Sequence, residues 1–320
     1  MKVIYTDIKQ TQTHNEIDIN SLEVGRALVF NVLIQRADNY IIIIEAGTVL
    51  TDTLYTKLQN QDKLYVAKKN QHKQTLSCET LDTYISYNKN DFKMVLSFLY
   101  EINNKIFNDF LKSKEDVINT SCLDQIVKSL IMLIKYNPNY LKGMIPHFIS
   151  EYSILYHSLH VCIYSIMLSH FLNFSKEEMF QVGKAALMHD LGVKKINDSI
   201  IKKKTALTVK ELEIVHKHPY YSSEIAKKNF VNNQYILDAI IHHHENLDGT
   251  GYPHRIKGDN VRGFAAILSI CSVFDALTND KPYREKHSTF DALKIMMKDH
   301  SMTGKFNKQY LKVFLNLLTQ

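Results

Sequence analysis

Hydrophobic positions follow a strand-like pattern over the first 70 residues. Short apolar runs, several rich in β-branched side chains, are separated by polar residues, and one stretch between them has helical spacing. We expect strands at residues 27–32, 40–44 and 64–67, and a short helix over Thr51 to Gln59. Residues 1–70 are therefore predicted to form a small β-containing N-terminal module.

Helical spacing replaces this pattern further along the chain. Residues 70–90 are polar and aperiodic, as expected for a linker, whereas from Asp91 to Asn137 apolar side chains recur three and four positions apart until Pro138. These helices are either the beginning of the next domain or a connector that carries a signal and pairs two chains. We favour a helical connector packed on that domain, so that residues 71–140 comprise linker and connector. We expect two protein interactions. One is a homodimer formed through the connector, and the other is with a signalling partner protein.

Residues 141–320 are predicted to form one all-helical domain, which makes the chain mainly α. Ser175 with Glu178, and Thr208 with Glu211, have the spacing of capping boxes, and Ser288 is placed to cap a helix through Met297. The most apolar long window, Ile154 to Leu172, contains three histidines, which indicates a buried helix and not a membrane span.

Composition narrows the class of protein. The chain has 320 residues, enough for two domains, and 45% apolar content is ordinary for a globular protein. Its net charge of +6 comes from dispersed lysines, which suits a small anionic nucleotide better than a nucleic acid or a membrane surface. The four cysteines are far apart without CxxC spacing, which predicts reduced thiols, and Met1 to Asn20 is too polar for a signal peptide. We expect a soluble cytoplasmic protein.

The candidate chemistry centres on the string HHHENLDGTGYP, from His242 to Pro253. Adjacent histidines on a helix point about 100° apart, so two of them meet one metal ion only if the backbone leaves the helix there. Gly249 and Gly251 provide that freedom. Nine of the fifteen histidines fall between residues 157 and 244, and imidazole with carboxylate suits iron, manganese, zinc or nickel. The string predicts a metal site joined to a ligand-binding loop.

Several separate motifs, taken together, resemble the HD-GYP branch of the HD metal-dependent phosphohydrolases. The motifs are His157, His189-Asp190, His218, the segment from His243 to Pro253, Asp275-Ala276-Leu277-Thr278, and the KPYR string at Lys281 to Arg284. Their order and spacing match over about residues 145 to 318. The resemblance implies an all-helical domain with a two- or three-metal centre that hydrolyses the bacterial second messenger cyclic di-GMP to pGpG or GMP. It also implies a binding site for cyclic di-GMP itself.

The resemblance assigns roles to the site residues. Asp190 is expected to bridge two divalent ions, with His218, His243 and His244 on one and with His157 and His189 on the other. Iron or manganese is favoured, with zinc or nickel as alternatives. Candidate catalytic residues are Asp190, Asp275 and Lys194. The expected substrate-binding residues are Gly251, Tyr252 and Pro253 of the turn, where Tyr252 offers an aromatic face, and Lys281 and Arg284 for the phosphates.

Three of the departures from the family pattern bear on the metal ions and on catalysis. Ser153 stands where a glutamate often binds a third metal, so two metals are expected. Val193 replaces a lysine near the substrate phosphate, and Lys194 comes one residue late, which turns its side chain by about 100° on a helix. Ser272 stands where the last metal-binding aspartate is expected. Asp275 lies three residues on and shares its helical face, so either Asp275 substitutes or the first metal is weakened.

Three functions remain after these departures. The first is an active cyclic di-GMP phosphodiesterase. The second is a weak or inactive relative that binds cyclic di-GMP or a partner protein as a sensor or adaptor. The third is an HD hydrolase of another nucleotide, which the GYP loop disfavours. The N-terminal module resembles one found ahead of some HD-GYP domains, through Leu22, Val24, Gly25 and residues 46–51, but a generic β-hairpin cap explains the same residues.

Overall fold

The structure is a computed structural model of the 320-residue chain. It describes residues 14–319 apart from the following positions: 23, 25–27, 29, 38, 46–47, 49, 68–77, 79–80, 149–152, 204, 262, 281–283 and 300–301, and the side chains of 83, 86 and 87. Packing divides the chain into two compact units, residues 1–102 and 103–320, and each is described by itself.

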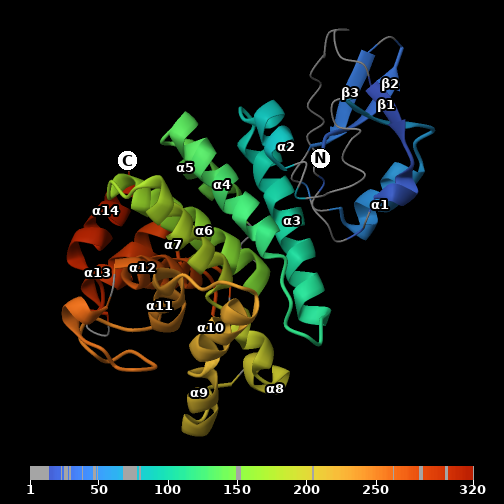
Figure 1. Ribbon diagram of the computed structural model, residues 1–320. Coiled ribbons are helices and arrows are strands. Elements are labelled where there is room, and N and C mark those ends of the chain that lie inside the picture. Colours follow the sequence, from blue (N-terminus) through green and yellow to red (C-terminus); the bar gives the residue numbers. More distant parts are fainter. Residues whose placement is uncertain are drawn as a thin grey trace. The chain divides into compact units, whose positions relative to one another are not determined.

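The first unit contains the small sheet drawn in blue in Figure 1. Its four strands are antiparallel, in the order β1-β4-β2-β3. The strands are β1 (His14–Ile17), β2 (Val32–Arg36), β3 (Asn39–Ile44) and β4 (Leu64–Ala67), and helix α1 (Asp52–Gln59) lies between β3 and β4 in sequence. Val32, Leu50, Leu58 and Leu64 belong to the apolar core under this sheet. The predicted elements at 40–44, 51–59 and 64–67 are confirmed, with Thr51 as the helix N-cap.

The strand predicted at residues 27–32 overlaps β2 only at Val32, because β2 begins there and continues to Arg36. Residues 28, 30 and 31 are not part of the strand, and residues 27 and 29 lie outside the described residues. The second half of β2 is polar, so hydrophobicity gave no signal there. The cause is pairing: Gln35 lies opposite Tyr40 and Arg36 opposite Asn39 in a tight hairpin, and backbone hydrogen bonds extend the strand through exposed residues.

The linker predicted at residues 70–90 is wrong for its second half. Residues 81–88 form helix α2 (Leu81–Asn88), whose Leu81, Tyr84 and Ile85 are buried at helical spacing. The helical run from Asp91 onward is confirmed as α3 (Phe92–Lys112) and α4 (Thr120–Tyr136), and the latter ends two residues before Pro138.

The second unit is all-helical in the residues that the structure describes, which confirms the predicted fold class. Its α-helices after α4 are α5 (Tyr140–Met144), α6 (Ile154–Phe171), α7 (Lys176–Met188), α8 (Asp198–Ile201), α9 (Val209–Val215), α10 (His218–Lys228), α11 (Gln234–His242), α12 (Gly263–Thr278), α13 (Thr289–Lys298) and α14 (Lys308–Thr319). Short 3₁₀ turns occur at Ile145–His147, Leu191–Lys195 and Gly258–Asn260. The capping boxes at Ser175 and Thr208 and the Ser288 cap are confirmed.

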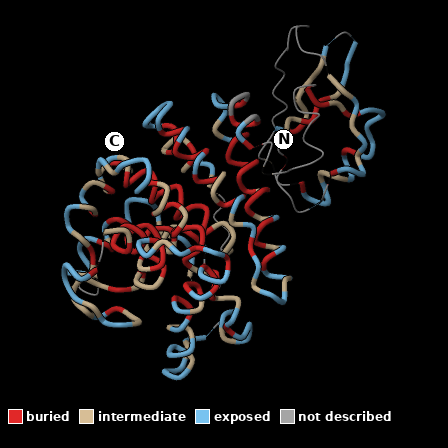
Figure 2. Tube along the Cα trace, viewed as in Figure 1, coloured by how far each residue is buried: buried red, intermediate tan, exposed pale blue. Residues whose placement is uncertain are grey.

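Helix α6 is the core helix of this unit. It packs against α4, α5, α7, α12 and α14, and Figure 2 shows buried residues concentrated at the centre of the helical bundle. Although α6 is long and apolar enough to cross a membrane by length and composition, 72% of it is buried inside the protein. A helix that is apolar on all sides needs such surroundings, and this confirms the buried helix predicted from the sequence.

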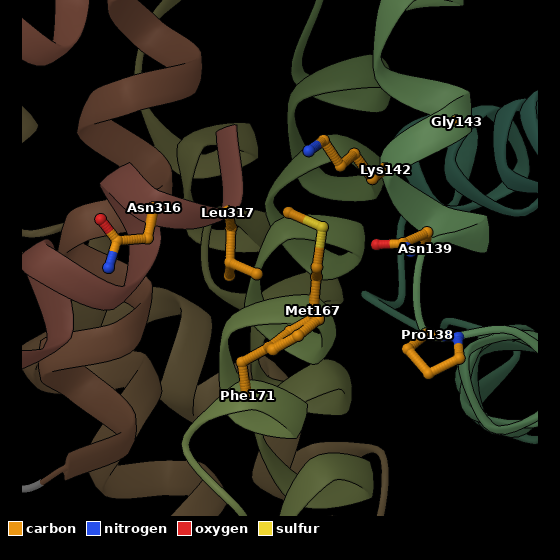
Figure 3. A pocket seen from close by; sticks show the side chains of 8 residues that line it. All are labelled: Pro138, Asn139, Lys142, Gly143, Met167, Phe171, Asn316 and Leu317. Atoms are coloured by element: carbon orange, nitrogen blue, oxygen red, sulfur yellow. The ribbon is translucent and has the colours of Figure 1, made fainter. Parts of the chain in front are cut away.

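Two further features lie apart from the candidate chemistry. A hollow of about 630 Å³ lies between α5, the end of α6 and α14, where Lys142, Met167, Phe171 and Leu317 line it (Figure 3). None of the predicted site residues is among its lining residues.

The prediction of reduced thiols holds for Cys162 and Cys271, which are free and buried, but is wrong for Cys78 and Cys122, each of which takes part in a disulfide.

Candidate metal centre

Asp190 and five histidines meet in the second unit. They form two groups able to hold a metal ion, and Asp190 belongs to both: His218, His243 and His244 complete one group, and His157 and His189 complete the other. We call the first the three-histidine half-site and the second the two-histidine half-site. Within each group the candidate ligand atoms lie within 4.8 Å of one another. These are the residues that the sequence analysis selected as ligands, and their role as ligands stays a prediction.

Most of these residues stand at helix ends. His189 is the C-cap of α7 and Asp190 begins the following 3₁₀ turn, His218 begins α10, and His243 is the C-cap of α11. His157 is the exception, in the first turn of α6. Because the chain changes direction at the end of a helix, consecutive side chains such as those of His189 and Asp190 turn toward a common point.

Gly192 brings two of these ends together. A Cβ at this position would lie 2.2 Å from the His218 carbonyl oxygen and 2.5 Å from the Ser222 nitrogen, so no side chain fits. The Gly192 N–H instead donates to Ser222 Oγ at 2.8 Å. This close backbone approach places the turn that carries Asp190 directly against the beginning of α10 and His218.

The two carboxylate oxygens of Asp190 face different half-sites. Oδ1 lies 3.2 Å from His218 Nε2 and 3.6 Å from His243 Nε2. Oδ2 lies 3.4 Å from His189 Nε2 and 3.7 Å from His157 Nε2. A carboxylate shared in this way has the geometry of a bridge between two ions.

Four of the five imidazoles are held through Nδ1. The rings of His189, His218 and His243 donate Nδ1–H to the carbonyl oxygens of Ala186, Val215 and Ile240, respectively, at 2.7, 2.8 and 2.7 Å. His157 Nδ1 lies 2.7 Å from Asp275 Oδ2. Because Nδ1 carries the proton in these bonds, Nε2 presents a lone pair toward Asp190, which is the tautomer that a metal ligand requires.

The distances between the Nε2 atoms test whether a metal ion fits. His157 Nε2 and His189 Nε2 are 3.3 Å apart, and so are His218 Nε2 and His243 Nε2. Two unprotonated nitrogens at this distance repel each other. Two nitrogens bound tetrahedrally at about 2.0–2.1 Å from one ion would be about 3.4 Å apart. Each pair therefore has the spacing of two ligands on a shared cation.

Protonation of the groups matches this interpretation. Burial lowers the pKa of His189 to about 3 and keeps the pKa values of His243 and His244 below the ordinary histidine value. Burial acts to raise the pKa of Asp190, but the surrounding imidazoles, His189 first, outweigh it and hold the pKa well below the usual range. His189, His243 and His244 are thus held neutral beside the ionised carboxylate of Asp190, and the negative charge of that carboxylate favours a cation.

The loop after α11 folds back on His244. A Cβ at Gly251 would lie 2.4 Å from the His244 carbonyl oxygen, and the Tyr252 N–H donates to that same oxygen at 3.2 Å. Gly249 has φ of 82°, and the Tyr252–Pro253 peptide bond is cis. Gly251 is therefore required by close backbone contact, whereas the sequence analysis expected it in substrate binding.

Glu245 organises the same loop, a role that the sequence analysis missed. Its side chain is buried and accepts hydrogen bonds from the backbone N–H groups of residues 254, 255 and 256 at 2.6, 3.0 and 3.2 Å. The available signal was an acid directly after the paired histidines and just before the glycine-containing turn. A carboxylate that is buried at such a place needs donors.

The comparisons with known proteins agree with this geometry. A family model described as HD domain matches residues 135–306, more than half of the chain. The chain belongs to the HD-domain family. This agrees with the resemblance to the HD-GYP branch, and HD-domain phosphohydrolases are metal-dependent.

Three curated relatives carry phosphodiesterase names. A cyclic di-GMP phosphodiesterase of Pseudomonas aeruginosa is 28% identical over 62% of this chain and 47% of its own length. A cyclic di-GMP phosphodiesterase of Borreliella burgdorferi is 31% identical, covering 55% and 45%. A 3'3'-cGAMP-specific phosphodiesterase of Vibrio cholerae is 33% identical, covering 51% and 35%. The chain thus spans half or less of the length of these relatives.

A solved structure shows the same fold. A protein of Bdellovibrio bacteriovorus described as a HDG"Y"P protein superposes with a TM-score of 0.60 at 18% sequence identity, over 96% of this chain and all of the other. At this identity the likeness concerns the fold alone.

The last acid of the HD-GYP pattern lies outside the ligand groups. Asp275 is buried and uses both oxygens on imidazoles: Oδ2 lies 2.7 Å from His157 Nδ1 and Oδ1 lies 2.9 Å from His160 Nδ1. Asn279 also donates to Oδ2 at 2.7 Å. Of the two alternatives, a substituting Asp275 or a weakened first metal, this position disfavours the first, because Asp275 lies behind His157 and outside both ligand groups. Ser272 Oγ lies 3.4 Å from His157 Nε2, on the ligand side of that ring.

Lys194 also departs from its expected place in the HD-GYP site. Its ammonium donates to the carbonyl oxygens of Phe110 and Ser113 at 2.8 and 2.6 Å and lies 3.2 Å from Asp116 Oδ1. These oxygens at the end of α3 hold its charge, and the catalytic role of Lys194 stays a prediction.

Tyr252 and Arg284 likewise have partners within the protein, and their roles in substrate binding stay predictions. The Tyr252 ring stacks on His216, with centroids 3.8 Å apart, and on His244 at 4.7 Å, so imidazoles occupy the aromatic surface that was expected for a guanine. The Arg284 guanidinium donates to the carbonyl oxygens of Ala276, Leu277 and Glu285 at 2.7, 3.2 and 2.8 Å. It caps the end of α12. Lys281 lies outside the described residues.

Proposed function

We propose that this centre binds two divalent transition-metal ions and hydrolyses cyclic di-GMP to pGpG or GMP. The observation that carries the proposal is the position of Asp190, whose two oxygens face two sets of imidazoles with their Nε2 lone pairs presented. Iron or manganese suits this mixed imidazole and carboxylate set, and zinc or nickel is the alternative.

The chain's residues divide the work between the half-sites. His218, His243 and His244 would hold one ion and His157 and His189 the other, with Asp190 shared. Bound ions supply Lewis acidity and an activated water at neutral pH. The carbonyl anchors on Nδ1 hold the rings in the binding tautomer, and the ionised Asp190 balances the positive charge. Asp275 keeps His157 oriented through its Nδ1.

The names of the relatives support the substrate class. Two relatives are named cyclic di-GMP phosphodiesterases and a third is named for 3'3'-cGAMP, so all three act on a cyclic dinucleotide by name. We assign cyclic di-GMP as the substrate of this chain, and 3'3'-cGAMP is the competitor to be tested beside it.

The test uses the full chain after metal loading. Protein loaded with Fe²⁺ under anaerobic conditions, or with Mn²⁺, is incubated separately with cyclic di-GMP and 3'3'-cGAMP, and the products are separated by chromatography. We expect pGpG or GMP from cyclic di-GMP, and loss of product in Asp190→Asn, which keeps the size of the side chain but removes its charge. Protein with two metal equivalents that hydrolyses neither nucleotide would overturn the proposal.

One observation favours the alternative of a cyclic di-GMP-binding sensor or adaptor with weak catalysis. The two-histidine half-site has Ser272 beside His157, and a serine hydroxyl is a poorer metal ligand than a carboxylate. The relatives' names favour the enzyme. Binding of cyclic di-GMP with one metal equivalent and no product would identify the adaptor.

The domain plan belongs to the same proposal. We propose residues 1–70 as an input module, 71–140 as linker and helical connector, and 141–320 as the HD-GYP domain. The connector is proposed to pair two chains and to receive a signalling partner protein. Sedimentation of the full chain, with and without a substitution on the exposed face of α4 at Met132, tests the pairing.

A further inference from the structure

His244 is held differently from the other four imidazoles of the centre. His157, His189, His218 and His243 each have an oxygen partner on Nδ1. In the part of the chain that the structure describes, no such oxygen accepts from the His244 ring. A ligand ring without this anchor is free to rotate about its side-chain bonds unless packing stops it.

Packing on Tyr252 supplies that restraint. The two rings are stacked, with centroids 4.7 Å apart and planes 27° apart. The backbone reinforces the contact, because the Tyr252 N–H donates to the His244 carbonyl oxygen at 3.2 Å. The orientation of His244 therefore depends on where the Tyr252 ring lies.

His216 holds the Tyr252 ring in turn. Their centroids are 3.8 Å apart and their planes 13° apart, a closer and more parallel stack than that of Tyr252 with His244. His216 is the C-cap of α9, and its N–H donates to the Leu212 carbonyl oxygen at 2.8 Å, so its backbone is fixed by that helix. The three rings form a continuous series from α9 to the three-histidine half-site.

We propose that His216 is a positioning residue for the metal centre, acting by stacking on Tyr252 and so orienting His244. This inference rests on the proposed function in that it treats His244 as a ligand. This positioning role requires only the flat ring of His216, and neither hydrogen bonding nor protonation of its nitrogens. The series also makes the exposed helix α9, which has no buried residue, a point from which movement would reach the half-site.

Two substitutions separate the ring from its chemistry. His216→Phe keeps a flat ring and removes both nitrogens, whereas His216→Ala removes the ring. Mn²⁺ binding by the full chain is measured by calorimetry for each variant. An aromatic pair typically contributes enough to change affinity by about threefold to tenfold. We expect His216→Ala to weaken Mn²⁺ binding by that factor and His216→Phe to stay within twofold of the unsubstituted chain.

A metal-free measurement keeps the inference independent of the proposed function. Histidines of the metal-free chain are carbethoxylated with diethylpyrocarbonate, and mass spectrometry measures the rate at each histidine. The exposed His254 is the internal reference for the amount of reagent. We expect His244 to react several-fold faster in His216→Ala and at the unsubstituted rate in His216→Phe. If the unsubstituted chain binds no Mn²⁺, the proposed function fails. The reactivity of His244 still shows whether the stack of His216 on Tyr252 holds the His244 ring.

Two outcomes overturn the inference. Equal His244 reactivity in all three proteins means that the stack does not hold the ring. An equal loss of Mn²⁺ affinity in His216→Ala and His216→Phe means that the imidazole nitrogens matter. His216 would then act through its nitrogens and not through stacking.

Discussion

The Ser272 hydroxyl lies 3.4 Å from His157 Nε2, the atom of that ring that faces Asp190. The hydroxyl thus stands on the ligand side of the two-histidine half-site, whereas Asp275, three residues later, stands behind the same ring on Nδ1. A carboxylate at position 272 would face the half-site directly. In this chain only the acid behind the ring, Asp275, is present, and it supports His157 through Nδ1.

We expect Ser272→Asp to raise metal occupancy of the two-histidine half-site, and with it turnover, because a carboxylate is a stronger ligand and balances charge. Metal equivalents per chain and initial rates on cyclic di-GMP are the measurements. Ser272→Asn is the matched control, since it has the same size without the charge. If the unsubstituted chain already holds two equivalents and Ser272→Asp adds no activity, the serine is not limiting.

His243→Ala is expected to remove metal from the three-histidine half-site. Its Nε2 lies 3.6 Å from Asp190 Oδ1, and the ring is buried. A metal at a hundred times its Kd stabilises the folded state by about 2.7 kcal/mol, and this variant should lose that gain. Metal analysis and thermal unfolding with and without Mn²⁺ measure both effects. His242→Ala, one residue earlier and bonded to His254, should keep its metal; unchanged metal in His243→Ala would contradict the assignment.

Stability of the metal-free chain should fall as pH drops below about 6.5. Burial lowers the folded-state pKa of His189 to about 3, so between pH 6.5 and 3 the unfolded chain binds a proton that the folded chain does not. Each such histidine costs up to about 1.4 kcal/mol per pH unit in that window. Urea unfolding from pH 7.5 to 5 measures the slope. His189→Gln should flatten it, and an unchanged slope would show that His189 does not contribute.

Motif order was enough to identify which residues meet, because the ligands are chemically distinctive and their helices are recognisable from spacing and caps. His157, His189 and His218 come from three different helices or helix ends, and the resemblance supplied that association. The sheet was harder, since β2 extends through polar Gln35 and Arg36 by pairing alone.

The directions of long side chains were beyond the sequence. Lys194 was a candidate catalytic residue although it comes one residue late in the motif, and its partners are carbonyl oxygens more than 80 residues earlier. Tyr252 was expected to be open for stacking, but its stacking partner His216 belongs to another helix end. Such pairings depend on tertiary contacts that spacing along one element does not report.

Lys194→Met should destabilise the fold more than Lys195→Met. Lys194 has three oxygen partners and lies over the Phe110 ring, so its loss leaves partly buried acceptors unsatisfied at a cost of about 2 kcal/mol. Lys195 lies 3.4 Å from the same Asp116 but is 36% exposed, which limits its contribution to below about 1 kcal/mol. Urea unfolding of the metal-free variants makes the comparison. Equal losses would mean that the contacts of Lys194 are not the stabilising ones.

Arg284→Ala separates a capping role from phosphate recognition. If the guanidinium bound substrate phosphate, its loss would weaken cyclic di-GMP binding by tenfold or more, because each charge-assisted contact contributes about 1.5–3 kcal/mol. Both terminal nitrogens of the guanidinium donate to carbonyl oxygens, and two of these oxygens belong to the last turn of α12. A cation at this end of a helix also interacts favourably with the helix dipole. We therefore expect Arg284→Ala to lower the free energy of unfolding by about 1–2 kcal/mol and to leave the Kd of cyclic di-GMP within about threefold. Calorimetry on the metal-loaded protein and urea unfolding give the two numbers, and a large loss of affinity at unchanged stability would restore Arg284 to the substrate site.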